Sequence, residues 1–247
     1  MNDAPLLETR ALTLHAAGRP LVERLAWRVN AGERWCVIGR NGAGKSLVLR
    51  ALAGLGVPRR EGEVLWQGRP QRDWPVGAAA TLRALMPQQA QDRFALTVER
   101  TLALSEVAAG DLRAGELMAA LDIASLASRR ADQLSGGERQ RVALAQCAVQ
   151  GAALMLLDEP VSFQDPAHQQ VVGRWLVDAV PSQHGRQAWV ASAHDPGWIG
   201  RVATHVLALL GDGRWRAGPV HEILSAPVLE QTYGCAWRSV EGVWLPA

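Results

Sequence analysis

One segment of this chain, a glycine-rich loop between an apolar strand and a helix, restricts its fold more than any other feature. The loop matches the phosphate-binding pattern G-x-x-x-x-G-K-[S/T] at every required position and consists of Gly39, Arg40, Asn41, Gly42, Ala43, Gly44, Lys45 and Ser46. Residues 35–38 before it are apolar, as in a buried strand, and residues 47–52 have the composition of a helix. Strand, loop and helix in this order are the context that the motif requires, so the segment predicts an α/β fold with a phosphate site.

The chemistry of the loop suits the phosphates of a nucleotide. Its glycines let successive N–H groups point inward at anionic oxygens, and the helix that begins near Gly44 adds its positive end. Lys45 is the only lysine among the 26 lysine and arginine residues. A compact ammonium fits inside the loop and reaches the β- and γ-phosphates, whereas a planar guanidinium has the wrong shape. The hydroxyl of Ser46 is suited to a Mg²⁺ ion that bridges these phosphates.

Length and composition exclude several other classes of protein. A chain of 247 residues can bury a substantial core, in one domain or in one domain with a subdomain. The net charge of +2 is too small to indicate nucleic acid as the main partner. No stretch approaches the ~18 apolar residues of a membrane-spanning helix, and the N-terminus lacks the pattern of a signal peptide. Cys36, Cys147 and Cys235 have no metal-ligand spacing, so we expect three buried thiols in a reducing cytosol.

Hydrophobic periodicity predicts the remaining elements. Residues 6–29 contain two apolar runs around a Gly-Arg-Pro turn, which predicts two strands of a small antiparallel sheet. Short strands are expected at 62–68 and 84–87. The apolar runs 153–157, 188–192 and 206–210 predict strands buried on both faces of a parallel sheet. From residue 98 to about 131 the pattern becomes helical, and residues 134–150 predict a turn followed by a long helix.

Two acids, Asp158 and Glu159, directly follow the apolar run at 153–157. Open α/β sheets bind their ligands at this end of their strands. Asp158 is suited to hold Mg²⁺, directly or through water, and Glu159 to polarise an attacking water as general base. Capping of the next segment is the alternative, but Lys45 and Ser46 in the same chain favour a functional pair.

A second candidate anion site lies 90 positions beyond Lys45, in the sequence Leu-Ser-Gly-Gly-Glu-Arg-Gln of residues 134–140. Ser135 is suited to cap the following helix, and Gly136 and Gly137 leave backbone N–H groups accessible. A simple helix N-terminus is the alternative. Because one nucleotide does not need two such sites, we expect this one to serve a nucleotide held by another subunit.

The phosphate loop, the Leu-Ser-Gly-Gly-Glu segment and the Asp-Glu strand, in this order, resemble the ATP-binding subunit of an ABC transporter. The resemblance covers roughly residues 6–234, and the Leu-Ser-Gly-Gly-Glu signature is close to diagnostic of that superfamily. It implies a phosphate-loop NTPase core with a mainly parallel sheet, a small N-terminal antiparallel β subdomain and an inserted α-helical subdomain. We expect one ABC ATPase domain over 1–247, with a catalytic core at 1–88 and 135–225, a helical signature subdomain at 89–134 and a C-terminal tail at 226–247.

The resemblance implies three further site residues. Gln88, with Gln89 as the alternative in register, matches the Q-loop glutamine, which contacts the Mg²⁺ and water side of the γ-phosphate in the family. Asp165 matches the D-loop aspartate, which crosses the dimer interface. His194 matches the switch histidine near the γ-phosphate, a position where the charge of the imidazole is sensitive to its surroundings.

Several positions depart from the family pattern. Arg40 replaces a usual proline and Gln164 a usual leucine of the D-loop. Leu47 stands where threonine is frequent, so a hydroxyl contact with the nucleotide is lost. The aromatic residue that stacks on adenine is missing upstream of the phosphate loop; His15 is nearest in register and would stack less strongly.

The resemblance also implies partners. In a head-to-tail homodimer, each ATP with its Mg²⁺ would lie between Lys45, Ser46 and Asp158 of one subunit and Ser135 and Gly137 of the other. Polytopic membrane permease subunits would be direct partners, and an extracytoplasmic substrate-binding protein an indirect one, without nucleic acid. This places the subunit at the cytoplasmic face of the inner (cell) membrane as a peripheral protein.

The cargo is less constrained, because cargo does not touch this subunit. Residues 165–169 and the tail segments 218–224 and 232–234 resemble subunits that import iron–siderophore, heme or cobalamin. The chain ends 53 residues after His194, so no large regulatory extension is expected. The alternatives are another importer or exporter class and a non-transport ABC protein. A translation-factor type would carry two cassettes, a chromosome-maintenance type would need a long coiled coil, and a non-hydrolysing regulator would lack Glu159 or His194.

Overall fold

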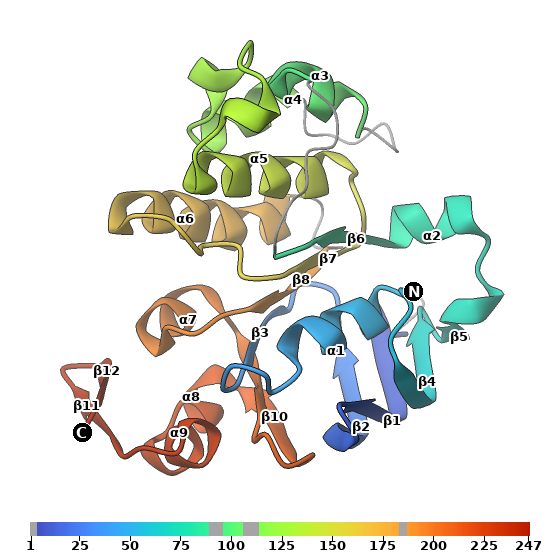
Figure 1. Cartoon of the computed structure of the whole chain (residues 1–247), viewed down its shortest axis with the longest axis vertical. Helices are drawn as coiled ribbons and strands as arrows, with labels where there is room; N and C mark the ends of the chain where they lie inside the picture. Colours follow the sequence, from blue (N-terminus) through green and yellow to red (C-terminus); the bar gives the residue numbers. More distant parts are fainter. Residues whose placement is uncertain (1–3, 89–95, 106–113, 183–186) are drawn as a thin grey trace.

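The computed structural model describes residues 4–88, 96–105, 114–182 and 187–247, which fold into an α/β architecture (Figure 1). The described strands are β1 (Leu7–Ala16), β2 (Arg19–Val29), β3 (Arg34–Ile38), β4 (Arg59–Trp66), β5 (Arg69–Pro70), β6 (Arg83–Met86), β7 (Leu154–Leu157), β8 (Ala188–Ser192), β9 (His205–Leu209), β10 (Trp215–Pro219), β11 (Trp237–Val240) and β12 (Val243–Pro246). The described α-helices are α1 (Lys45–Leu52), α2 (Val76–Leu82), α3 (Val98–Ala103), α4 (Ala114–Ala120), α5 (Gly136–Val149), α6 (Pro166–Ser182), α7 (Pro196–Val202), α8 (Val220–Ile223) and α9 (Ala226–Tyr233).

Within these segments, six strands form the central sheet in the order β10-β9-β3-β8-β7-β6. The pairs from β9 to β6 are parallel, and β10 pairs antiparallel with β9 at one edge. A parallel arrangement brings the carboxyl ends of β3, β7 and β8 to one edge of the sheet. The loops that follow these three strands carry the phosphate loop, the pair Asp158 and Glu159, and His194, so the topology gathers these predicted site residues in one place.

Side chains of the parallel strands alternate between two cores, because successive residues of a strand point to opposite faces. In β3, Cys36 and Ile38 belong to the core on the side of α5, α6 and α7. Trp35 and Val37 belong to the other core, which includes α1 and the antiparallel sheet. Every residue of β7 and β8 is buried. This confirms the prediction that their apolar runs are strands covered on both faces.

A second sheet, in the order β2-β1-β4-β5, is antiparallel at each pairing. Its β1–β2 hairpin confirms the two strands expected at 6–29, with the turn at Gly18. The fold class is therefore the one expected, a mainly parallel core with a small antiparallel β subdomain. The proposed division of the chain at 88, 134 and 225 remains a prediction.

Helices α3 and α4 pack on α5, which separates them from the central sheet (Figure 1). The helical pattern expected from 98 to about 131 is only partly realised. Helix α4 ends at Ala120 because Asp122 adopts a left-handed φ of 52°, and the N–H of Ile123 bonds to the carbonyl of Met118 at 2.8 Å. After this Schellman-type end the chain forms 3₁₀ turns at Ala124–Leu126 and Ala131–Gln133 rather than a longer helix.

The C-terminal part of the chain adds a helix, α9, and a two-stranded hairpin of β11 and β12 that the sequence did not predict. Cys36 and Cys147 are buried as expected, but Cys235 is exposed, so the expectation of three buried thiols is wrong. Cys235 directly follows Gly234, which ends α9, and lies in the connection to β11 rather than inside an element. Within the described segments, no helix combines the length and apolar content that crossing a bilayer requires.

Candidate functional site

The phosphate loop joins the end of β3 to α1, as its motif predicts. Gly44 is the N-cap of α1 with a φ of 99°, a backbone conformation that favours glycine. The Lys45 side chain is buried and its Nζ donates to the carbonyls of Gly39 at 2.9 Å and Arg40 at 3.3 Å. Burial lowers the pKa of Lys45, while the negative charges of Glu159 and Asp158 act in the opposite direction. The ammonium is therefore held inside the loop.

Most of the predicted site residues line one cavity of about 770 Å³. Its lining residues come from the phosphate loop and α1, from the β1–β2 hairpin and from the loops after β6, β7 and β8, and are Ala16, Leu21, Asn41, Gly42, Gly44, Lys45, Ser46, Leu47, Arg50, Gln88, Glu159 and His194. Asp158 lines an adjoining cavity of about 590 Å³ together with Ser46 and Gln88. Of the two candidate glutamines, Gln89 lies outside the described residues.

The acidic pair at the end of β7 is fixed by Ser192, the last residue of β8. The hydroxyl of Ser192 donates to Asp158 Oδ1 at 2.6 Å, and it accepts the backbone N–H of Glu159 at 2.8 Å. Ser192 is completely buried. One hydroxyl thus fixes the orientation of the Asp158 carboxylate and the position of the Glu159 backbone. No sequence motif indicated this role of Ser192.

Glu159 has a left-handed backbone conformation, with a φ of 52°, which residues other than glycine rarely adopt. The Glu159 carbonyl accepts from Gln140 Nε2 of α5 at 2.8 Å, so both backbone polar groups of Glu159 have side-chain partners. Such strain persists where the surroundings over-determine it, which is typical of functional sites. The sequence did not predict a role for Gln140, although it is the last residue of the segment 134–140.

The Glu159 carboxylate faces the cavity and is held by three side chains. Ser162 Oγ donates to Oε2 at 2.8 Å, His194 Nε2 lies 3.1 Å from Oε1, and Gln88 also hydrogen-bonds to it. Burial acts to raise the pKa of Glu159, but the hydrogen bonds from Ser162, His194 and Gln88 outweigh it and lower the pKa. The carboxylate is therefore charged at neutral pH.

His15 was expected to lie beside the adenine base, at the end of the cavity nearest the β1–β2 hairpin, and the structure differs from this expectation. Ala16 lines the cavity and His15 does not; His15 Nδ1 is buried without a hydrogen-bond partner. Arg19 reaches the loop from the same hairpin, and its Nη2 donates to the Gly42 carbonyl at 3.5 Å.

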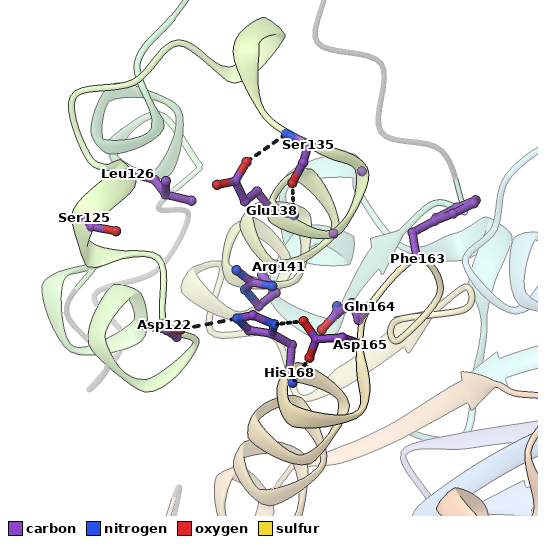
Figure 2. A pocket seen from close by; sticks show the side chains of 12 residues that line it. Asp122, Ser125, Leu126, Ser135, Glu138, Arg141, Phe163, Gln164, Asp165 and His168 are labelled. Atoms are coloured by element: carbon purple, nitrogen blue, oxygen red, sulfur yellow. Dashed lines mark hydrogen bonds and ion pairs between the residues drawn. The ribbon is translucent and has the colours of Figure 1, made fainter.

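A second cavity, of about 580 Å³, surrounds the N-terminus of α5 (Figure 2). Ser135 Oγ accepts the N–H of Glu138 at 3.3 Å, and the Glu138 carboxylate accepts the N–H of Ser135 at 2.8 Å. This reciprocal capping box leaves the amides of Gly136 and Gly137 at the cavity wall. Arg141, which is buried and whose Nε has no hydrogen-bond partner, also lines it.

The opposite wall of this second cavity comes from the segment before α6. Asp165 accepts the N–H of His168 at 2.9 Å, and its Oδ2 lies 2.8 Å from His168 Nδ1 (Figure 2). His168 Nε2 lies 3.4 Å from Asp122, so it connects the α4 region to the segment of Asp165. The exposed Phe163, with a φ of 63°, belongs to the same segment and lies beside Gly136 and Gly137 at the N-terminus of α5.

The two cavities have no lining residue in common. A phosphate loop, an acidic pair at the end of a parallel strand and a separate capped helix N-terminus are the features of a phosphate-loop NTPase with a second candidate anion site.

Comparison with known proteins identifies the family. The family model described as ABC transporter matches residues 22–162. The hemin import ATP-binding protein HmuV of Streptomyces coelicolor is 38% identical over 231 residues, which cover 90% of this chain and 81% of that protein. The protein of the same name from Ruegeria sp. is 32% identical over 247 residues, which cover 94% of this chain and 92% of the relative.

Solved structures show the same fold. A metal-chelate type ABC transporter in an inward-facing conformation matches with a TM-score of 0.79 over 98% of each chain, at 23% identity. The cbiO1 protein of Clostridium perfringens, described as part of the ABC transporter complex cbiONQ, matches with a TM-score of 0.74 over 92% of this chain and 93% of its own, at 20% identity. The present chain belongs to the ABC transporter family and is an ATP-binding, ATP-hydrolysing member of it.

Proposed function

We propose that this chain is the ATPase subunit of an importer and that it hydrolyses ATP at the phosphate-loop cavity. The observation that carries the proposal is the convergence of Lys45, Ser46, Gln88, Glu159 and His194 on one cavity, although they come from four separate segments. The residues of the phosphate loop and Leu47 would bind the nucleotide, and Glu159 would be the general base.

The contacts of Glu159 support its role. Its lowered pKa keeps the carboxylate ionised at neutral pH, so it can accept a proton from water. Gln88 and His194 both touch the carboxylate and line the same cavity. They are therefore placed to orient a water beside the γ-phosphate, with His194 positioned to donate a hydrogen bond to that phosphate. This arrangement accounts for the hydrolysis that family membership implies.

The oxygen atoms near Lys45 fit a magnesium ion. Ser46, Gln88 and Asp158 share one cavity wall and supply a hydroxyl, an amide oxygen and a carboxylate, which are ligands that Mg²⁺ accepts. When bound, the ion would neutralise phosphate charge. Ser192 holds Oδ1 of Asp158 by its hydroxyl, which orients the carboxylate for this purpose.

The second cavity supports a head-to-tail homodimer. Ser135, Gly136 and Gly137 form an anion-binding helix end that shares no lining residue with the phosphate-loop cavity of the same chain. In the dimer, this helix end of one subunit would close on the ATP of the other, with Asp165 near the contact.

His15 remains the proposed neighbour of the base by register, although Ala16 is the residue that faces the cavity.

The names of the relatives suggest the partners and the cargo. Because several relatives are named hemin import ATP-binding proteins, we assign this chain to an importer of heme or a similar iron chelate. Its direct partners would be polytopic permease subunits, and it would lie peripherally at the cytoplasmic face of the cell membrane. An extracytoplasmic binding protein would deliver the cargo. Loss of growth on hemin as the iron source after deletion of the chain tests the cargo.

Replacement of the proposed base tests the site. We expect Glu159→Gln to bind ATP with nearly unchanged affinity and to lose at least about 10²-fold in hydrolysis rate, because the amide cannot accept the proton. Phosphate release and nucleotide binding are measured on the same preparations, in complex with the permease subunits that co-purify.

Glu61→Gln, at an exposed carboxylate of β4, is the matched control and should retain hydrolysis. Normal turnover by Glu159→Gln would remove Glu159 from the base role. Absence of nucleotide binding by the unmodified chain would remove the proposal as a whole.

A further inference from the structure

Tyr233, the only tyrosine of the chain, approaches the site from the C-terminal side. It is the last residue of α9, and its hydroxyl lies 3.5 Å from the carbonyl oxygen of His194. The backbone of Gly39 also acts on this hydroxyl and lowers the pKa of the phenol. His194 follows β8 and Gly39 follows β3, which are neighbouring parallel strands. One side chain therefore connects the two loops that leave these strands.

The protonation state of Tyr233 suits both contacts. Burial raises the pKa of the phenol above its usual range, and the hydrogen bond with Gly39 only partly opposes this. The hydroxyl is thus neutral at physiological pH and has one proton to donate and lone pairs that accept. The hydroxyl is placed to donate to the His194 carbonyl and can accept from the backbone of Gly39, so one side chain faces both backbone groups.

Residues next to Tyr233 hold the same segment against the phosphate loop. Gly234 ends α9 with a φ of 75°, and a Cβ at this position would lie only 3.3 Å from the guanidinium carbon of Arg40. On its other side, Tyr233 packs on Trp237 of β11 with 5.4 Å between ring centroids. The hydroxyl is therefore fixed by packing as well as by hydrogen bonds.

Each of the two loops near the Tyr233 hydroxyl also contacts a charged group of the site, Lys45 in one case and Glu159 in the other. The carbonyl of Gly39 accepts from Lys45 Nζ, and the His194 ring contacts the Glu159 carboxylate. A change in the separation of Gly39 and His194 would change the position of the ammonium relative to the imidazole. These two groups face the same cavity, where the γ-phosphate is proposed to lie.

We propose that Tyr233 is a positioning residue for ATP hydrolysis, whose hydroxyl sets the separation between the phosphate loop at Gly39 and the loop of His194. This inference rests on the proposed function, in which Lys45 and His194 act on the same phosphate. Tyr233, at the end of α9, is then part of the ATPase site, although it lies outside the three motifs that define the site in the sequence.

Tyr233→Phe tests the hydroxyl alone, because the ring and its packing on Trp237 are kept. We expect kcat to fall by about 3- to 10-fold, which is within the range expected for the loss of one hydrogen bond, while KM for ATP changes less than about 2-fold. Hydrolysis is measured on the complex with the permease, and the midpoint of thermal unfolding is recorded for each variant.

Thr232→Val is the matched control, since it removes a buried hydroxyl one residue earlier that bonds to Val228 within α9. It should lower thermal stability at least as much as Tyr233→Phe but leave kcat within about 2-fold. Gly234→Ala is a second test: it keeps the hydroxyl but strains the turn against Arg40, and should also lower kcat more than KM changes.

The outcomes separate this inference from the proposed function. If the unmodified chain hydrolyses ATP, and Tyr233→Phe and Gly234→Ala both retain kcat, Tyr233 is not a positioning residue. An equal loss of kcat in Thr232→Val would also overturn the inference, because it would show a general effect of α9 stability. If the unmodified chain does not hydrolyse ATP, the proposed function itself fails.

Discussion

The phosphate-loop cavity has small and aliphatic side chains at the end where the adenine base is proposed to lie. The family resemblance implies an aromatic ring at this place. Ala16 and Leu21 line this part of the hairpin, and no Phe, Tyr or Trp is among the described lining residues of the cavity. An aromatic ring would add stacking of about 0.5–1.5 kcal/mol with a planar base. We therefore expect base recognition to depend on weaker contacts than phosphate recognition.

Ala16→Tyr is expected to tighten ATP binding by about 2- to 10-fold, because the new ring would extend into the cavity and stack on adenine. The dissociation constant is measured by calorimetry in the Glu159→Gln background, which prevents turnover. Ala17→Tyr, at the exposed turn of the same hairpin, is the control and should leave the affinity unchanged. Equal affinity of both variants and the unmodified chain would show that position 16 does not face the base.

The sequence identified those site residues that lie in contiguous motifs. Lys45, Ser46, Asp158 and Glu159 were found because their spacing and their strand-and-loop context carry the chemistry. Ser192 and Gln140 were missed, since a buried serine at the end of a strand and a glutamine inside a helix resemble ordinary core residues. Their roles depend on the pairing of β7 with β8 and on the packing of α5, which no local pattern records.

At the scale of an element, the N-terminus of α5 combines a structural and a proposed functional role. The backbone N–H of Ser135 and the Ser135 hydroxyl hold the pKa of Glu138 below its usual value of 4.5, although burial acts in the opposite direction. A carboxylate whose pKa is lowered by folding stabilises the folded state above its unfolded pKa, and that contribution is lost as the pH falls through its folded pKa.

Glu138→Gln is therefore expected to be less stable than the unmodified chain at pH 7, and this difference should shrink as the pH falls from about 5 to about 3. The midpoint of thermal unfolding is compared at several pH values, with Glu241→Gln at the exposed β11–β12 turn as control. A difference between Glu138→Gln and the unmodified chain that stays constant over this range would show that the capping carboxylate does not contribute through its charge.

Elements with strong periodicity were predicted well, and the others were not. The strands β3, β7 and β8 and the helices α1 and α5 follow from apolar runs and caps in the sequence. The region after α3 was expected to be more helical, because its Ala and Leu content has high helix propensity, but Asp122 ends α4 in a left-handed conformation. The β11–β12 hairpin was not predicted, since its short strands are largely exposed and lack a clear alternation.

For the whole molecule, the central feature is the separation of two candidate phosphate-binding surfaces. One is the phosphate-loop cavity, and the other is the capped N-terminus of α5. The proposed homodimer explains why one chain has both, because each surface would complete the other across the interface. The proposed role of Tyr233 would add a third element, a C-terminal segment next to the loops of the first surface.

The most direct test of this account is the mass of the Glu159→Gln variant in sedimentation velocity experiments with and without ATP. We predict a monomer of 26.6 kDa without nucleotide and a species of twice that mass with ATP and Mg²⁺. Adding Ser135→Arg should prevent dimerisation without preventing ATP binding, because Ser135 does not line the phosphate-loop cavity. A Glu159→Gln chain that stays monomeric when saturated with ATP, or that dimerises equally well with Ser135→Arg, would contradict the account.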